Sequence, residues 1–147
     1  MIEYFRQYIG KPAGEIPAPP FTQWLNGKLL RVEPGEIEAE FVVRKEMTNP
    51  AGMLHGGIHA AILDDVVGMT VACCGLENLY VSVNLYIDFL APAKVGETII
   101  ARSKVIRAGK TILNATAELY NQAGALLSRA TTNMANTGLP ALDVQQF

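Results

Sequence analysis

Residues 49–76 read NPAGMLHGGIHAAILDDVVGMTVACCGL, and the predicted architecture starts from this stretch. Its apolar part, residues 56–76, is long enough to cross a bilayer, but it contains His59, Asp64 and Asp65. Each aspartate at the centre of a membrane span costs about 2.5–3.5 kcal/mol. We therefore predict a long buried helix near residues 55–74 of a soluble protein, with no membrane as partner.

Strand patterns stand on both sides of the predicted helix. Residues 28–33 and 36–43 read as two strands with a turn at Pro34-Gly35 between them. After the helix, further strands are predicted at residues 79–90, 97–107, 110–121 and 125–136. Successive strands joined by tight turns pair antiparallel. The chain is therefore predicted to be an α+β protein, with a curled antiparallel sheet of five to six strands wrapped round one long central helix.

Period-2 alternation assigns faces to the predicted strand at 79–90. The residues on its apolar face are Val81, Val83, Leu85, Ile87 and Phe89. The residues on its polar face are Ser82, Asn84, Tyr86 and Asp88. This pattern predicts that Ser82 and Phe89 lie on opposite faces of the strand.

The two ends of the chain are expected to lie outside this sheet. Residues 1–9 predict a short amphipathic helix, and the proline-rich residues 10–20 predict an irregular connector, so residues 1–24 form an N-terminal extension. The segment 138–147 is expected to be a loose tail. With 147 residues, the chain is expected to be one domain, residues 1–147.

Composition restricts the class of partner. Half of the residues are hydrophobic and only 18% are charged, against about 25% in ordinary soluble domains, which favours a homo-oligomer. The net charge is -2 and no basic run is present, so no nucleic acid is expected as a partner. The chain starts without an apolar leader, and the adjacent Cys73 and Cys74 are in poor geometry for a disulfide. We expect a cytoplasmic location.

Gly56 and Gly57 stand at the start of the predicted helix, where each glycine costs about 1 kcal/mol. One interpretation is a cap or close packing of the backbone. The other is that the missing side chains let a ligand reach the N–H groups of the first turn. Those groups have no acceptor within the helix and lie at the positive end of its dipole, so they suit a carbonyl oxygen that becomes an oxyanion.

Asp64 and Asp65 lie in the middle of the apolar helix, where carboxylates are rare unless they are paired or used. Either one could be a satisfied core group or could face solvent at the edge of the sheet. Removal from water raises the pKa of a carboxyl group, which suits a general base near neutral pH. Asp64 has more room beside it, since its helical neighbours include Ala60, Ala61 and Gly68.

The spacing of these residues limits how they can act together. Gly56 and Asp64 are eight residues apart, which is about 12 Å along one helix. One ester or thioester carbonyl cannot touch both. If both act on one bond, the aspartate must come from a second subunit with an antiparallel helix, as in a two-fold dimer.

Other chemistries have weaker support. His55 and His59 are spaced to share a metal, but no third ligand is evident, so no metal or other cofactor is expected. No serine-nucleophile motif or nucleotide-binding loop is present, and neither cysteine has an activating base. Four cations gather around one predicted hairpin, either as solvated strand edges or as a phosphate-binding patch; they are Arg102, Lys104, Arg107 and Lys110.

The pattern Asn49-x-x-Gly52-x-x-His55-Gly56-Gly57 followed by Asp64 resembles the hot-dog-fold acyl-CoA thioesterases. The likeness is greatest to the phenylacetate-pathway (PaaI-type) and 4-hydroxybenzoyl-CoA groups, and it covers roughly residues 25–137. It continues through residues 81–84, 91–97 and 109–111.

The resemblance implies a role for each matching position. Asp64 matches the catalytic carboxylate, a general base or nucleophile, with Asp65 in reserve. Gly56 matches the residue whose N–H polarises the thioester carbonyl, while Gly57 belongs to the same substrate-binding turn. Asn49 and His55 match positions that hold the loop and the water or carbonyl, and Ser82 matches a strand hydroxyl that helps place the attacking water. Arg107 and Lys110 become candidate contacts of CoA phosphates.

The function expected from the resemblance is hydrolysis of acyl-CoA to a carboxylic acid and CoA, without a cofactor. It also implies a homodimer or a tetramer built from two dimers, with sites at the subunit interface. Two alternatives remain: a non-catalytic acyl-CoA-binding module and a hydratase on the same fold. The acyl specificity and the role of residues 1–24 are left open.

Overall fold

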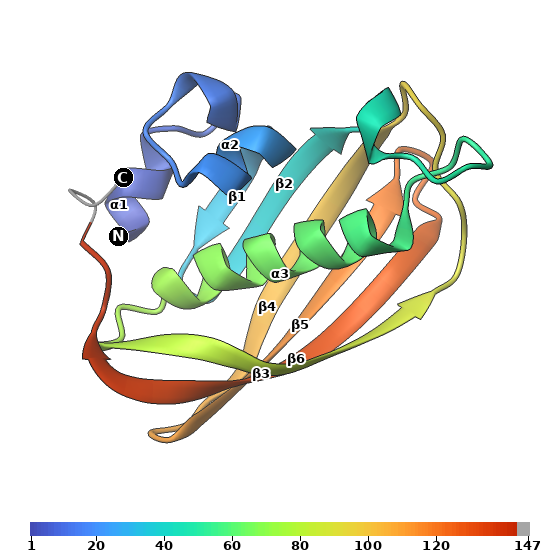
Figure 1. Ribbon diagram of the computed structural model, residues 1–147. Coiled ribbons are helices and arrows are strands. Elements are labelled where there is room, and N and C mark those ends of the chain that lie inside the picture. Colours follow the sequence, from blue (N-terminus) through green and yellow to red (C-terminus); the bar gives the residue numbers. More distant parts are fainter. Residues whose placement is uncertain (144–147) are drawn as a thin grey trace.

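The computed structural model describes residues 1–143, which form one antiparallel sheet around a central helix (Figure 1). The strands are β1 (Lys28–Glu33), β2 (Glu36–Val42), β3 (Asn78–Phe89), β4 (Thr98–Ala108), β5 (Ile112–Asn121) and β6 (Leu126–Pro140). The α-helices are α1 (Ile2–Arg6), α2 (Pro20–Leu25) and α3 (Gly56–Ala72), with 3-10 turns η1 (Ala13–Glu15) and η2 (Lys45–Met47). The predicted α+β class and hot-dog architecture are confirmed, with six strands in the sheet.

The sheet has the order β1-β2-β4-β5-β6-β3, and every neighbouring pair is antiparallel. The first hairpin turns at Gly35, whose φ of +72° is a conformation that glycine adopts without strain. Strand β3 does not pair with its successor β4 but with β6, so β3 forms one edge of the sheet and β1 the other. The long crossing between β2 and β3 is α3 itself.

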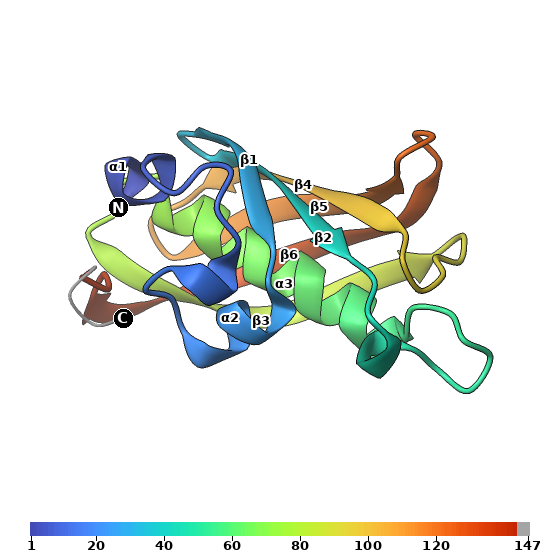
Figure 2. The same cartoon turned by 90° about the horizontal axis from the view of Figure 1, so that it is seen from above.

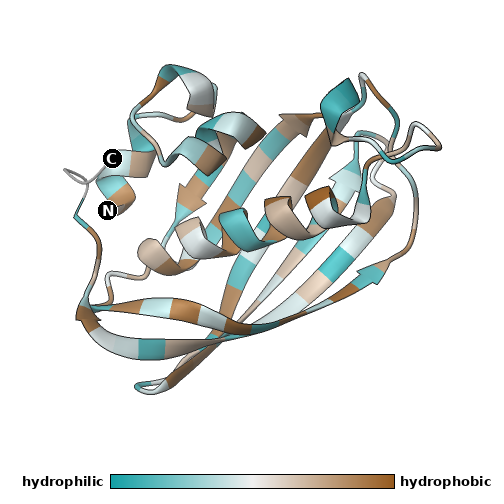
Figure 3. Cartoon of the chain, viewed as in Figure 1, coloured by the Kyte–Doolittle hydropathy of each residue, from teal (hydrophilic) through white to brown (hydrophobic). Residues whose placement is uncertain are grey.

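Helix α3 supplies the centre of the core, as the curled sheet in Figure 2 shows. Its buried apolar side chains are Ile62, Leu63, Val66, Val67 and Val71. They pack against the apolar face of the sheet, which includes Ile37, Ala39, Phe41 and Val43 as the alternation predicts. Figure 3 shows the apolar residues of α3 and of the sheet as brown bands among white and teal ones. No helix among residues 1–143 has the length and hydropathy needed to cross a bilayer.

The ends of the chain differ from the prediction in two places. The predicted N-terminal helix is shorter and ends at Arg6, and a second short helix, α2, follows the proline-rich connector. The expected loose tail starts too early, because β6 continues through Pro140 and Ala141 N–H donates to Glu77 O at 2.9 Å. Residues 144–147 of that predicted tail lie outside the described residues.

Strand β3 contains a bulge at Val83, which corrects the predicted faces. Ser82 pairs with Met134 and Asn84 with the adjacent Asn133, so Val83 has no partner in the ladder. Asn84 holds the bulge, since its Oδ1 accepts from Asn133 N–H at 2.9 Å. One extra residue reverses the alternation, so Ser82 faces α3 together with the later residues Leu85, Ile87 and Phe89. Val81 and Val83 are exposed, at 44% and 57%.

Candidate functional site

The loop before α3 is held in place by backbone hydrogen bonds. Asn49 Oδ1 accepts from the N–H groups of Ala51 at 3.0 Å and Met53 at 3.1 Å. Leu54 N–H donates to Ala93 O at 2.8 Å, and His55 N–H donates to Met47 O at 2.9 Å. These bonds give the start of α3 a defined position relative to the sheet. Asn49 therefore orders the loop through its side chain.

The two glycines at the start of α3 have different environments. His55 is the N-cap residue, and its Nδ1 accepts from Gly57 N–H at 2.8 Å. Gly56 N–H has no acceptor among residues 1–143. A Cβ on Gly56 would lie 3.4 Å from the ring of Phe89, which is an ordinary van der Waals contact, so packing within the chain does not require glycine at this position. One N–H group at the positive end of α3 thus remains available to a ligand.

Asp64 lies on the exposed side of α3, next to the edge strand. Ser82 Oγ donates to Asp64 Oδ1 at 3.0 Å. The bulge at Val83 makes this contact possible, because it places Ser82 on the inner face of β3. The structure therefore brings together a solvent-accessible carboxylate and a hydroxyl group that fixes its orientation.

Asp65 has a different environment, although it is the next residue. Thr22 Oγ1 of α2 donates to Asp65 Oδ1 at 2.8 Å. Asp65 Oδ2 is buried and has no hydrogen-bond partner among the described residues. Burial, together with a smaller effect of the neighbouring Asp64, raises the pKa of Asp65 to about 6 against the opposing effect of the Thr22 hydrogen bond. Asp65 therefore attaches α2 to α3 rather than facing solvent.

The raised pKa of Asp65 predicts a pH dependence of stability. Its folded pKa of about 6 lies above its ordinary value of 3.8, so the folded protein holds this proton more tightly than the unfolded chain. As the pH rises through this range, ionisation lowers the free energy of unfolding by about 2–3 kcal/mol. Asp65→Asn removes this loss and is expected to be more stable than the wild type above about pH 6. Urea unfolding of both proteins at about pH 4 and about pH 7.5 measures the effect; equal pH dependence would contradict it.

The predicted site residues form two groups in one chain. Asn49, His55, Gly56 and Gly57 lie at the start of α3, while Asp64 and Ser82 lie further along the helix and β3. Helical rise separates Gly56 from Asp64 by about 12 Å. One chain thus holds the predicted site residues as two separate groups, the two half-sites of the predicted composite site.

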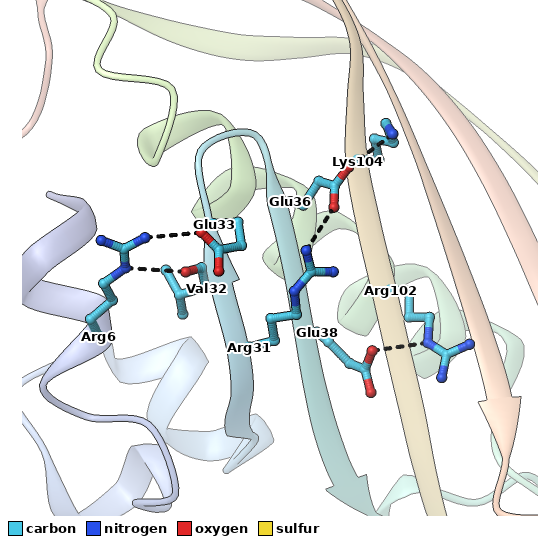
Figure 4. Close-up of polar contacts among 8 residues, drawn as sticks. All are labelled: Arg6, Arg31, Val32, Glu33, Glu36, Glu38, Arg102 and Lys104. Atoms are coloured by element: carbon cyan, nitrogen blue, oxygen red, sulfur yellow. Dashed lines mark hydrogen bonds and ion pairs between the residues drawn. The ribbon is translucent and has the colours of Figure 1, made fainter.

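The four predicted cations divide into two pairs. Arg102 and Lys104 form ion pairs with Glu38 and Glu36 of β2, at 3.0 Å and 2.8 Å, as Figure 4 shows. Arg107 and Lys110 flank the turn between β4 and β5 and form no ion pair within residues 1–143. The local patch of cations is therefore smaller than the sequence suggests.

A cavity of about 530 Å³ lies beside the second half of α3, and sequence reasoning did not find it. Both Asp64 and Asp65 line it, together with the N-terminal segment, the inner face of β1 and β2, and the start of β3. Residues 1–19 contribute to its wall although their sequence shows only short helical spacing and prolines. No local signal places such a segment over a helix that lies far along the chain.

Two further reactive side chains, those of His59 and Cys73, are buried. His59 Nδ1 lies 2.9 Å from Ser128 Oγ, and burial lowers the pKa of this histidine. Burial also raises the pKa of Cys73 to about 11, which disfavours the thiolate. Within residues 1–143, no group of three or more His, Cys, Asp or Glu side chains is placed to hold a metal ion.

Comparison with known proteins agrees with this architecture. Residues 51–128 match the thioesterase superfamily model, which covers more than half of the chain. Human acyl-coenzyme A thioesterase 13 is 36% identical over 95 residues, which are 65% of this chain and 68% of that protein.

Two crystal structures superpose over most of the chain. A putative thioesterase from Ralstonia eutropha JMP134, described as a phenylacetic acid degradation-related protein, has a TM-score of 0.76 at 32% identity, covering 90% of this chain and 98% of that one. Zebra fish thioesterase superfamily member 2 has a TM-score of 0.77 at 27% identity, covering 92% and 94%. The chain therefore belongs to the thioesterase superfamily, as a hot-dog-fold thioesterase of the PaaI type.

Proposed function

We propose that this thioesterase hydrolyses acyl-CoA, giving a free carboxylic acid and CoA. The similarity to human acyl-coenzyme A thioesterase 13 supports CoA thioesters as the substrate class. The observation that carries the proposal is the hydrogen bond from Ser82 Oγ to Asp64 Oδ1, which orients an exposed carboxylate at the mouth of a mostly apolar cavity.

Asp64 is the proposed catalytic carboxylate. Ser82 occupies Oδ1, and Asp64 Oδ2 has no hydrogen-bond partner among residues 1–143, so it can accept a proton from water. The activated water attacks the thioester carbonyl carbon; the C–S bond then breaks, Asp64 returns the proton to the sulfur, and CoA leaves as the thiol. Direct attack by the carboxylate, with hydrolysis of the resulting anhydride, uses the same oxygen. Asp65 cannot replace Asp64, because its carboxyl group faces Thr22 and the interior.

Gly56 N–H is the proposed donor to the carbonyl oxygen. It has no acceptor among the described residues and stands at the positive end of a helix of 17 residues. Negative charge develops on the carbonyl oxygen as water attacks, so the N–H group and the helix dipole stabilise the transition state more than the substrate. Asn49 and His55 support this donor by holding the loop and the first turn. Gly57 N–H already serves His55, and a Cβ on Gly57 would lie 3.1 Å from His55 Nδ1, so the proposed contribution of Gly57 to substrate binding is to leave room for the His55 ring that caps the first turn.

The two half-sites are proposed to combine across a dimer. Gly56 and Asp64 of one chain are about 12 Å apart, too far for one thioester group. Strand β3 is an unpaired edge with exposed apolar residues, namely Val81, Val83, Tyr86 and Phe89. Antiparallel pairing of two such edges about a two-fold axis sets the two α3 helices antiparallel, so that Gly56 of each subunit approaches Asp64 of the other. Two such dimers would form the tetramer that the family resemblance also implies.

The CoA moiety is proposed to bind near the surface. Arg107 and Lys110 are exposed beside the turn between β4 and β5, and no carboxylate among residues 1–143 forms an ion pair with them. Cations of this kind suit phosphate groups.

Release of free CoA thiol is the direct test of the proposed function. The wild-type protein is expected to release CoA from acyl-CoA at a rate proportional to enzyme concentration. A binding module would bind acyl-CoA without releasing thiol, and a hydratase would consume an unsaturated acyl-CoA without releasing thiol. Either result would exclude the proposed hydrolysis.

A further inference from the structure

Gly68 is the feature of the cavity that the fold does not explain. It lies in the middle of α3, where glycine destabilises the helix relative to alanine. It is exposed, and a Cβ built on it would meet no atom within 4 Å. Gly27, which lines the same cavity, differs because its Cβ would overlap the ring of Phe41 at 2.3 Å. Packing within the protomer therefore requires glycine at position 27 but not at position 68.

The position of Gly68 relates it to the reacting group. Gly68 follows Asp64 by four residues, so both lie on the same face of α3, and Ala72 lies one turn further along it. All three line the cavity. A side chain larger than hydrogen at position 68 would extend into the space that leads away from Asp64.

The N-terminal segment closes the far part of this space. Figures 1 and 2 show α1 and the segment that follows it beside the C-terminal half of α3, at the end remote from Gly56. Tyr4, Phe5, Ile16 and Pro17 line the cavity from this segment. The hydrogen bond from Thr22 to Asp65 fixes α2, and with it the segment, to α3.

The chemistry of the wall favours an uncharged occupant. Most lining side chains are apolar, and the two carboxyl groups, Asp64 and Asp65, lie at the end where catalysis is proposed. An acyl chain with a terminal carboxylate would lose its hydration against this mostly apolar wall, in which Lys11 is the one lysine or arginine side chain among the described residues. Lys11 Nζ lies 5.6 Å from the centroid of the Tyr8 ring.

The length of the cavity determines how long an acyl chain it can hold. Asp64 and Ala72 are eight residues apart, which is about 12 Å along α3. An extended chain advances about 1.2 Å per bond, by analogy with ~3.6 Å for the three backbone bonds of a residue. The distance therefore corresponds to about ten carbons. The volume of about 530 Å³ lies within the range of small-molecule sites.

We propose that this cavity binds the acyl chain of the substrate, an uncharged aliphatic chain of about ten carbons that runs from Asp64 past Gly68 and under residues 1–19. This proposal rests on the proposed acyl-CoA hydrolysis and specifies its substrate class. Gly68 then determines the specificity for acyl-chain length, because its missing side chain leaves the path of the acyl chain open.

Chain-length profiles of two variants test the proposal. The wild type is expected to have a kcat/KM for decanoyl-CoA at least about 100-fold above that for acetyl-CoA, since each buried methylene adds to the binding of the transition state. Gly68→Leu is expected to lower kcat/KM for decanoyl-CoA about 100-fold while changing that for acetyl-CoA less than about three-fold. Gly68→Ala is the matched control, because it makes the same helical improvement but adds only one methyl group. A decanoyl chain that ends in a carboxylate is expected to be a poor substrate.

A second variant covers the case in which Gly68→Leu does not fold. Ala72 lies one turn further from Asp64 than Gly68 does, and Ala72→Leu replaces one good helix former by another. This variant is expected to move the preferred chain length toward shorter acyl groups. Unchanged length profiles in the folded variants would overturn the proposal. A folded Gly68→Leu protein that has lost its oligomeric state by light scattering would also overturn it, since Gly68 would then serve a subunit contact.

The outcomes distinguish failure of the proposed acyl site from failure of the proposed hydrolysis. If the wild type hydrolyses acetyl-CoA and decanoyl-CoA with equal kcat/KM, hydrolysis stands but the cavity is not the acyl site. If the wild type releases CoA from no acyl-CoA, the proposed function itself fails and the acyl site fails with it.

Discussion

Asp64→Asn is expected to lower kcat by about 10²–10⁴-fold, because the variant has no carboxylate to accept a proton from water or to attack the thioester. Asparagine keeps the size of the side chain, and its carbonyl oxygen can still accept the hydrogen bond from Ser82. Binding of CoA is expected to stay largely intact, since the substituted group does not contact the phosphates in the proposed arrangement. Steady-state kinetics with thiol detection, together with calorimetric titration of CoA, measures both effects.

Asp65→Asn is the matched control for this prediction. The two aspartates are adjacent on the same helix, but the Asp65 carboxyl group contacts Thr22 and is otherwise buried. Its substitution is expected to leave kcat within a few-fold of the wild type and to act on stability instead. Turnover at the wild-type rate by Asp64→Asn, or loss of turnover in Asp65→Asn alone, would show that the wrong carboxylate has been assigned.

Gly56→Pro is expected to lower kcat by about 10²–10³-fold, because proline lacks the N–H group proposed to hold the carbonyl oxygen. The substitution suits the local backbone: position 56 is the first residue of α3, where proline is common, and His55 has the extended conformation that proline favours before it (φ -64°, ψ 139°). Gly56→Ala is the control, since it places the same Cβ against Phe89 but keeps the N–H group. Equal activities of the two variants would exclude the backbone donor.

Mixing the two inactive variants tests whether the site is shared between subunits. A mixed dimer of Asp64→Asn and Gly56→Pro subunits has one complete site if Asp64 and Gly56 act across the interface. When the two variants are unfolded and refolded together, random reassortment makes about half of the dimers mixed. Each mixed dimer has one complete site out of two, so about a quarter of the wild-type activity is expected to return. If both groups acted within one chain, no mixture would recover activity, and the composite site would be wrong.

Local patterns were sufficient for most of the fold. The run from Gly56 to Leu76 is apolar on nearly every side, so it required burial on all sides, and its two aspartates excluded a membrane. The turn at Pro34-Gly35 and the alternation of Ile37, Ala39 and Phe41 set the first hairpin correctly. These features depend on contacts between near neighbours in sequence, which composition and periodicity report directly.

The pairing of β3 and the faces of its residues could not be predicted in this way. Whether β3 pairs with β4 or with β6 depends on the arrangement of the whole sheet. The bulge depends on the partner strand, and the sequence of β3 alternates regularly through Val83 without any sign of it. Tertiary structure therefore decided that Ser82 meets Asp64. The same holds for Asp65, whose carboxyl group accepts from Thr22, a residue 43 positions away.

The sequence by itself determined the long buried helix, the strands that surround it, the glycine turn at its start and the two carboxylates in its middle. Only the tertiary structure decided which carboxylate reaches solvent, which glycine N–H remains unpaired, and that residues 1–19 close a cavity beside Gly68. The physical reason is that helical periodicity and turn chemistry are local properties of the chain. The burial of one oxygen atom, or the space beside one glycine, is set by segments that are distant in sequence and meet only when the sheet has curled around α3.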